Sequence, residues 1–180
     1  MGGFIPGFRL FLCTAAFASL ACRQPGQRSG TILVVDDAGD SVAVRVPAGR
    51  VVSLIPASTE LLFAIGAGPS VVGRTEWCDY PAEAAAVPDL GAGINPNVEA
   101  VIATRPDLVV LYNSAQHAGI ATRLRDLGIP AIRINTDALA DVPRVASLLG
   151  RLTGRQRGAD SMSAVFDTAL ASATRESRPA

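Results

Sequence analysis

Residues 50–112 constrain the fold most strongly, because they repeat one pattern: a short, nearly unbroken apolar run beside a helix with a defined start. Residues 51–55 and 108–111 are the two runs, and Pro56 ends the first. Nearly continuous apolar runs of this length are typical of strands that are covered on both faces. Strands alternating with helices predict a parallel sheet, so we expect an α/β fold.

Two helices are expected to begin within this stretch. Ser58 or Thr59 can cap the first, which would place Glu60 in its first turn, near the positive end of the helix dipole. Asn97 is expected to cap the second, with Glu99 in the first turn. Each cap would fix the point at which the chain turns from a loop into a helix.

A hairpin is predicted before this stretch. Residues 31–35 and 41–46 are β-rich runs, and the segment between them holds Asp36, Asp37 and Asp40. The spacing of these aspartates does not match a calcium-binding loop, so a plain turn is favoured.

The strand–helix alternation continues after residue 112. A helix is expected over residues 116–127, with Ile120, Leu124 and Leu127 on its inner face, and a strand over 131–134. We therefore expect a doubly wound, mostly parallel sheet. With the hairpin, this lobe spans residues 31–140.

Residues 141–176 differ from the rest, because apolar residues there recur at helical spacing with a break at Gly154. A long helix is expected to end near Arg175. Its apolar stripe includes Met162, Phe166 and Leu170, and such a stripe needs a surface to pack on.

The N-terminus has the form of an export signal. Residues 1–21 hold Arg9 followed by an apolar segment, and Cys22 then begins a polar stretch, residues 22–30. Ala21-Cys22 resembles a lipoprotein cleavage site, which predicts lipidation of Cys22, a polar tether and a membrane anchor. Ordinary cleavage after Ala18 or Ala21, or an uncleaved anchor, are the alternatives.

Composition and motifs argue against several function classes. The formal charge is zero and the sixteen basic residues, all Arg, are scattered, so nucleic acid is not expected as a partner. No nucleophile with a base and no metal-ligand cluster is present, so neither catalysis nor a metal site is expected. The single histidine, His117, is interpreted as a solvated surface residue, and Cys78 as a small buried one.

Aromatic residues make up only 5% of the chain, so their placement is informative. Trp77 and Tyr112 both follow strands that we expect to be neighbours in the sheet. Ligands of open α/β sheets lie beyond the carboxyl ends of the strands, so the two rings could face a flat, partly apolar ligand. Packing in the interior explains either ring equally well.

Several motifs occur in a defined order: the aspartate hairpin, the run 50–60, Asp79-Tyr80-Pro81, Asn97-Val98-Glu99 and the run 105–109. Over about residues 31–175 they resemble the N-terminal lobe of the vitamin B12 and iron-siderophore substrate-binding proteins of ABC importers. In that family one long helix joins two α/β lobes, and the ligand lies between the lobes. The resemblance implies that residues 141–176 bridge to a second lobe, which this chain does not contain.

The resemblance also implies roles for individual residues. Ala57, Trp77 and Tyr112 match positions that contact the ligand, and Glu99 matches a glutamate that pairs with arginines of the permease. A third aromatic position of the B12 pattern is Gly93 here. Cobalamin, siderophores, haem and other chelates therefore all remain open as ligands.

The expected function is that of an exported, periplasmic or membrane-anchored receptor that captures a corrinoid or ferric-siderophore-type chelate, with no cofactor of its own. Its partners would be the subunits of an ABC permease. A truncated remnant that transports nothing, or a one-lobe module that recruits a partner through its exposed helix, are the alternatives.

Overall fold

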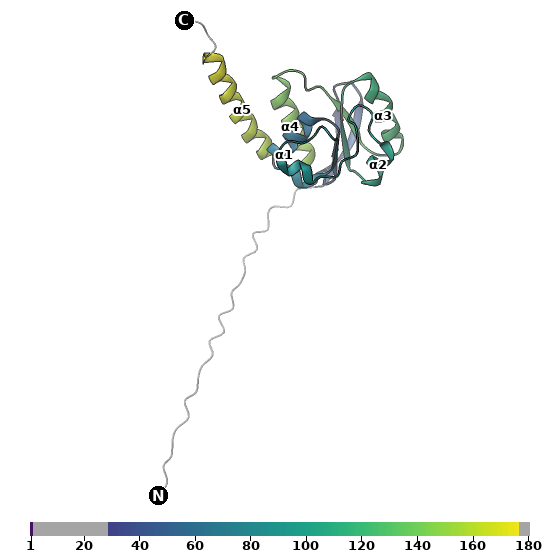
Figure 1. Ribbon diagram of the computed structural model, residues 1–180, viewed down its shortest axis with the longest axis horizontal. Helices are drawn as coiled ribbons and strands as arrows, with labels where there is room; N and C mark the ends of the chain where they lie inside the picture. Colours follow the sequence, from purple (N-terminus) through teal and green to yellow (C-terminus); the bar gives the residue numbers. More distant parts are fainter. Residues whose placement is uncertain (2–28, 177–180) are drawn as a thin grey trace.

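Figure 1 shows a computed structural model of the chain, which describes Met1 and residues 29–176. The expected signal peptide and Cys22 lie outside the described residues. Among the helices that are described, none combines the length and the apolar character that a membrane span requires.

Four parallel strands form the central sheet, as the apolar runs predict. They are β3 (Val51–Ser53), β4 (Val71–Arg74), β5 (Leu108–Tyr112) and β6 (Ala131–Ile134). Their spatial order is β4-β3-β5-β6, so β3 pairs with both β4 and β5. The strands that precede Trp77 and end in Tyr112 are therefore not neighbours, contrary to expectation, because β3 lies between them.

Helices cover both faces of this sheet. The helical elements are α1 (Pro56–Ala64), η1 (Gly68–Ser70), η2 (Ala82–Ala86), α2 (Val98–Ala103), α3 (Ala115–Asp126), α4 (Asp141–Thr153) and α5 (Gln156–Glu176). In Figure 1, α1 and α4 lie on one side of the sheet and α2 and α3 on the other. Two separate apolar clusters, one on each face, give the doubly wound arrangement that the sequence predicts.

The predicted hairpin is present as β1 (Gly30–Val35) and β2 (Ser41–Val46), an antiparallel pair that forms its own small sheet. Val34, Val42 and Val44 point into the cluster shared with α1 and α4. The aspartate turn lies against β6: the Asp37 amide donates to the Arg133 carbonyl over 3.0 Å. The hairpin thus covers the outer edge of the parallel sheet, which would otherwise expose unpaired backbone groups.

The first helix begins earlier than predicted, and its cap differs. Ile55 takes the cap position and Pro56 is the first residue, so Ser58 and Thr59 lie inside the helix, where both are buried. The Ser58 hydroxyl lies 2.6 Å from that of Ser53, and Thr59 donates to the Ser53 hydroxyl over 2.8 Å. These hydroxyls join α1 to the end of β3. Glu60 lies beyond the first turn.

The second helix begins as predicted. The Asn97 side chain accepts a 3.0 Å hydrogen bond from the Ala100 amide, and Glu99 lies in the first turn of α2. In α3, by contrast, the buried residues are His117, Ala121 and Leu124, whereas Leu127 is 57% exposed. Leu124 is buried and Ile120 packs partly against the core, as predicted, so the prediction was wrong only for Leu127; the face also includes the histidine.

The C-terminal region consists of two helices that are separated at Gly154, which has a φ of 69°. The first, α4, packs into the core of the lobe through Leu149, Leu152 and other buried residues. The second, α5, approaches α1 so closely that a side chain at Gly158 would collide with the Ile65 backbone. From this contact α5 extends away from the lobe (Figure 1), and Val165 on it is 71% exposed.

Candidate functional site

The residues assigned to ligand contact lie at one edge of the sheet, beyond or at the carboxyl ends of three strands. Ala57 follows β3, Trp77 follows β4, and Tyr112 is the last residue of β5. Because β3 is central, Ala57 belongs to the strand between the other two. Ligands of open α/β sheets bind at this edge.

Trp77 is 65% exposed, which excludes the interpretation that it packs in the interior. Its neighbour Cys78 is the opposite: it is 1% exposed, and its Sγ lies 3.2 Å from the Thr75 hydroxyl. Cys78 is thus the small buried residue that the sequence suggested. The β4–η2 loop therefore holds one side chain inside the protein and presents the adjacent indole ring outward.

Tyr112 is half-buried and packs partly against the apolar cluster of α1 and α4. Its hydroxyl donates to Oδ1 of Asp137 over 2.6 Å. This hydrogen bond, together with partial burial, raises the pKa of Tyr112 above its ordinary value of 10.0. The sequence analysis did not identify Asp137, because it comes close to Tyr112 only through the pairing of β5 with β6.

Ala57 lines a cavity of about 260 Å³ between α1, the segment after β6, and α5. Neither Trp77 nor Tyr112 contributes to its wall; the residues that do are Ala57, Glu60, Leu61, Thr136, Asp141, Val142 and Phe166. Phe166 of the predicted apolar stripe is thus half-buried over the lobe, and it lies at the same edge as Ala57.

His117 is not on the surface, contrary to the sequence interpretation. Only 5% of the His117 surface is exposed. Its Nε2 lies 2.7 Å from the carbonyl oxygen of Gly93, and its Nδ1 lies 3.0 Å from that of Tyr112. The spacing of His117, Ala121 and Leu124 is a helical one and could have indicated the burial. The approach of Gly93, by contrast, leaves no local signal in the sequence.

Gly93, where the B12 pattern has an aromatic residue, is buried in a narrow space. A Cβ built there would lie 3.3 Å from the Leu54 carbonyl oxygen and 3.4 Å from a Thr75 methyl group. An aromatic ring at this position would require the neighbouring backbone to move. The position therefore contributes a backbone carbonyl to the interior and no wall to a ligand site.

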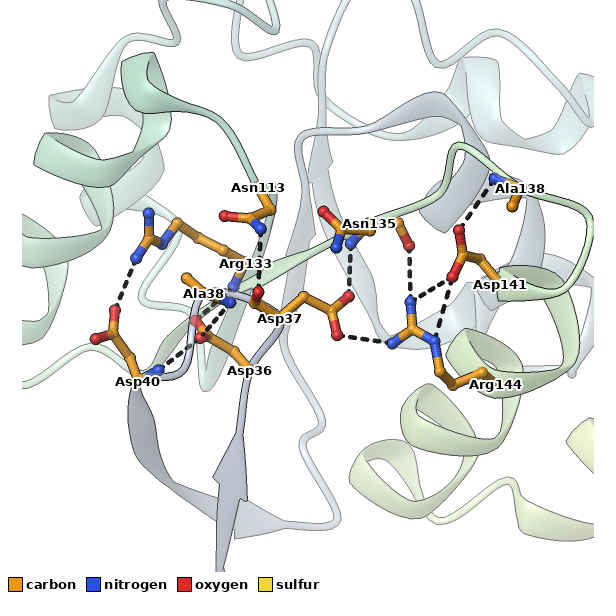
Figure 2. A network of polar contacts seen from close by, with 10 residues as sticks. All are labelled: Asp36, Asp37, Ala38, Asp40, Asn113, Arg133, Asn135, Ala138, Asp141 and Arg144. Carbon is orange, nitrogen blue, oxygen red and sulfur yellow. Dashed lines mark hydrogen bonds and ion pairs between the residues drawn. The ribbon is translucent and has the colours of Figure 1, made fainter.

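The aspartates of the hairpin turn do more than close the turn, as Figure 2 shows. Asp36, 5% exposed, accepts hydrogen bonds from the amides of Ala38, Asp40 and Arg133. Asp37 accepts a 2.6 Å bond from the Asn135 amide and pairs with Arg144 of α4 at 2.8 Å.

The Asp37 carbonyl also accepts a hydrogen bond from the side chain of Asn113, the residue that follows β5. Asn113 and Asn135 both follow strands at the carboxyl edge of the sheet. The turn therefore fixes the backbone that follows β5 and β6.

Glu99 is exposed, but it has a partner within the chain. Its Oε1 pairs with Arg123 of α3 at 2.9 Å, and its side chain is 73% exposed. A hydrogen bond from its own backbone amide and then the Arg123 guanidinium hold the pKa of Glu99 below its ordinary value. No group of three or more metal-ligating side chains occurs within residues 29–176.

A comparison with known families supplies the deciding observation. Residues 51–177 match the family model described as "Periplasmic binding protein", which covers more than half of the chain. The chain belongs to this family. The resemblance noted in the sequence is thereby confirmed, and the parallel sheet with a long C-terminal helix is the arrangement found in solved members.

Two curated members show how the chain relates to longer proteins. It is 33% identical over 134 residues to YvrC of Bacillus subtilis strain 168, an uncharacterised ABC transporter substrate-binding lipoprotein; the match covers 72% of this chain and 42% of YvrC. It is 30% identical over 94 residues to the vitamin B12-binding protein of Pectobacterium carotovorum, covering 52% of this chain and 34% of that protein.

Among solved structures, the periplasmic vitamin B12 binding protein BtuF of Vibrio cholerae is similar, with 25% identity and a TM-score of 0.64. The match covers 70% of this chain and 49% of BtuF. The chain thus spans less than half the length of each of these three relatives. The named relatives are binding proteins and not enzymes, in agreement with the lack of a catalytic motif.

Proposed function

We propose that this chain forms part of the substrate-binding receptor of an ABC importer, and that it captures a corrinoid or ferric-siderophore-type chelate for the permease. The observation that carries the proposal is the 65% exposure of Trp77 at the carboxyl edge of the sheet, the edge that also carries Ala57 and Tyr112. Membership of the periplasmic binding protein family supports it.

The exposed indole has a physical consequence. Burying a large apolar side chain fully is worth about 1.5–3 kcal/mol relative to leaving it exposed, so the fold forgoes much of that stabilisation at Trp77. A flat ligand that covered the ring would recover it. The phenol of Tyr112, whose hydroxyl donates a hydrogen bond to Asp137, would supply a second ring held in one orientation.

The test is to titrate the chain separately with cyanocobalamin, a ferric siderophore and haemin, and to measure the fluorescence of Trp77 during each titration. Because the chain contains one tryptophan, the signal reports on this position alone. We expect saturable quenching by one of these chelates. Quenching that rises linearly with every chelate, as simple absorption of light would cause, would refute the proposal for all three.

Glu99 is proposed to dock the receptor onto the permease. Its carboxylate is exposed in the first turn of α2, where the helix dipole favours a negative charge with or without a partner. Docking would require an arginine of the permease to share or replace Arg123. A charge pair at the rim of an interface acts mainly on the association rate and its salt dependence.

Export and lipidation of Cys22 are proposed from the leader sequence, and YvrC is named as a lipoprotein. Cells that express the wild type or Cys22→Ala can be fractionated into membrane and soluble exported material. We expect the wild type in the membrane fraction and the variant in the soluble one. The same distribution for both would refute lipidation and leave only export.

A partner-recruiting module is a second candidate function. We propose a division of the chain into a lobe over residues 31–140 and a helical region over residues 141–176. The exposure of apolar residues on the outer part of that region favours a partner. Val165 is 71% and Leu170 38% exposed on α5. Exposed apolar residues on one helix promote association, so light scattering at rising protein concentration tests this surface. A monomer at every concentration would count against it.

A further inference from the structure

We infer that His117 is a positioning residue that fixes the loop of residues 91–93 against the end of β5, and thereby sets the spacing between the Trp77 wall and the Tyr112 wall of the site. The inference rests on the proposed ligand site.

The imidazole joins two segments that are far apart in the sequence. Its Nε2 lies 2.7 Å from the carbonyl oxygen of Gly93, which is 24 residues away, and its Nδ1 lies 3.0 Å from that of Tyr112. The ring is held in place from its own backbone, because the His117 amide donates to the Ser114 hydroxyl that caps α3.

The loop at Gly93 is attached in turn to the segment that presents Trp77. The amide of Glu76, adjacent to Trp77, donates to the Gly91 carbonyl over 3.2 Å, and the Leu90 amide donates to the Arg74 carbonyl over 2.8 Å. Gly93 itself fits closely against Thr75. A shift of this loop would therefore move the backbone beside Trp77.

The two carbonyl oxygens depend on the imidazole to different degrees. The Tyr112 carbonyl also accepts a 2.9 Å hydrogen bond from the Ser114 amide, so it keeps a partner without the ring. Within residues 29–176, the Gly93 carbonyl accepts from His117 alone. The bond at Nε2 is thus the one that connects the two walls, and a buried carbonyl without it would draw the loop away from the interior.

The position of the ring protons determines which of the two carbonyls the imidazole can bind. A neutral imidazole carries one N–H and can donate to one of the two carbonyls, whereas the doubly protonated ring donates to both. Either state in which Nε2 carries a proton keeps the loop in place. A side chain that only filled the space would make neither bond.

Two amide variants separate the two bonds. His117→Gln places an N–H near the position of Nε2 and can keep the bond to Gly93, whereas His117→Asn places one near Nδ1 and can keep only the bond to Tyr112. Leu124→Ala is the matched control, because Leu124 is buried on the same face of α3 and contacts neither carbonyl through a hydrogen bond.

The first readout needs no ligand: the fluorescence anisotropy of Trp77, measured well below the melting temperature of each variant. His117→Asn should lower the anisotropy, His117→Gln should restore most of it, and Leu124→Ala should leave it unchanged. Equal anisotropy in His117→Asn and the wild type, or an equal fall in Leu124→Ala, would overturn the inference and leave His117 as a core residue.

The second readout is the dissociation constant for cyanocobalamin. Losing the preformed spacing should weaken binding about tenfold in His117→Asn and much less in His117→Gln. Unchanged affinity in His117→Asn would overturn the inference. If the wild type does not bind cyanocobalamin, the proposed function fails for that ligand, while the anisotropy series still decides the role of His117.

A wild-type measurement covers the case in which the variants do not fold. The chain has one histidine, so nitrogen-15 spectra of its imidazole contain a single set of signals. We expect an Nε2–H proton that exchanges slowly with water and couples to the Gly93 carbonyl carbon. An Nε2 without a proton would overturn the inference.

Discussion

The hydroxyl of Tyr112 donates a 2.6 Å hydrogen bond to Oδ1 of Asp137, which joins the last residue of β5 to the segment after β6. The bond fixes the orientation of one aromatic ring at the edge of the sheet where we place the ligand. It also places a carboxylate beside that ring, and removing the phenol proton there would bring two negative charges together.

Tyr112 should therefore ionise at a higher pH than an ordinary tyrosine. The hydrogen bond to Asp137 raises its pKa above 10.0, so the stabilisation is complete below that pH and is lost as the pH rises through the pKa of the folded state. Asp137→Asn should lower the pKa of Tyr112. Tyrosinate absorbance in a Tyr80→Phe background measures it, and an unchanged titration would show that the bond is absent in solution.

The hairpin turn should stabilise the whole lobe through Asp37. Asp37→Ala removes the acceptor of the Asn135 amide and the partner of Arg144, so the free energy of unfolding should fall by about 1–3 kcal/mol. Asp126→Ala, at an exposed aspartate of α3, is the control. Chemical denaturation measures both; equal stability of the two variants would mean that the turn does not anchor β6.

Acid should weaken the contact between the hairpin and the edge of the sheet. Hydrogen bonds from Arg133 and then Arg125 lower the pKa of Asp40 below its ordinary value of 3.8. A carboxylate with a depressed pKa stabilises the fold above its unfolded-state pKa, and this contribution is lost as the pH falls through the folded-state pKa.

The melting temperature of Asp40→Asn should therefore change less than that of the wild type between neutral pH and pH values below 3.8. Asp126→Asn serves as the control for a general effect of charge. Parallel curves for Asp40→Asn and the wild type would show that Asp40 does not contribute to acid sensitivity.

The elements were predictable from the sequence because their signals are local. The nearly continuous apolar runs identified β3 and β5, and Asn97 identified the start of α2. The start of α1 was misplaced because Ser58 and Thr59 are common capping residues. Pro56, which favours the first position of a helix, was the better signal.

The geometry of the site was predictable only in part. That Trp77 and Tyr112 lie at one edge follows from local sequence, but that β3 separates their strands depends on the order in which strands pair. The burial of His117 depends on Gly93, and the orientation of Tyr112 depends on Asp137. Each is a contact between segments whose spacing in the sequence carries no periodic signal.

The docking role of Glu99 can be tested by exchanging a charge pair. Glu99→Arg should slow capture by the permease, but it also places a like charge beside Arg123. The double variant Glu99→Arg with Arg123→Glu restores an internal pair of reversed polarity. If Glu99 docks the receptor, both variants should be captured slowly at low salt. Capture of the double variant at the wild-type rate would leave Glu99 as a residue of the α2 terminus only.

The central claim is that Trp77 forms a wall of a chelate site, and calorimetric titration of Trp77→Ala tests it most directly. The matched control is Tyr80→Ala, because Tyr80 is 66% exposed three residues further along the same loop but lines a different groove, beside η2. Using the chelate that quenches the wild type, we predict that Trp77→Ala weakens binding by about thirtyfold or more and Tyr80→Ala by little, with similar melting temperatures. Unaltered affinity in Trp77→Ala, or an equal loss in Tyr80→Ala, would contradict this account.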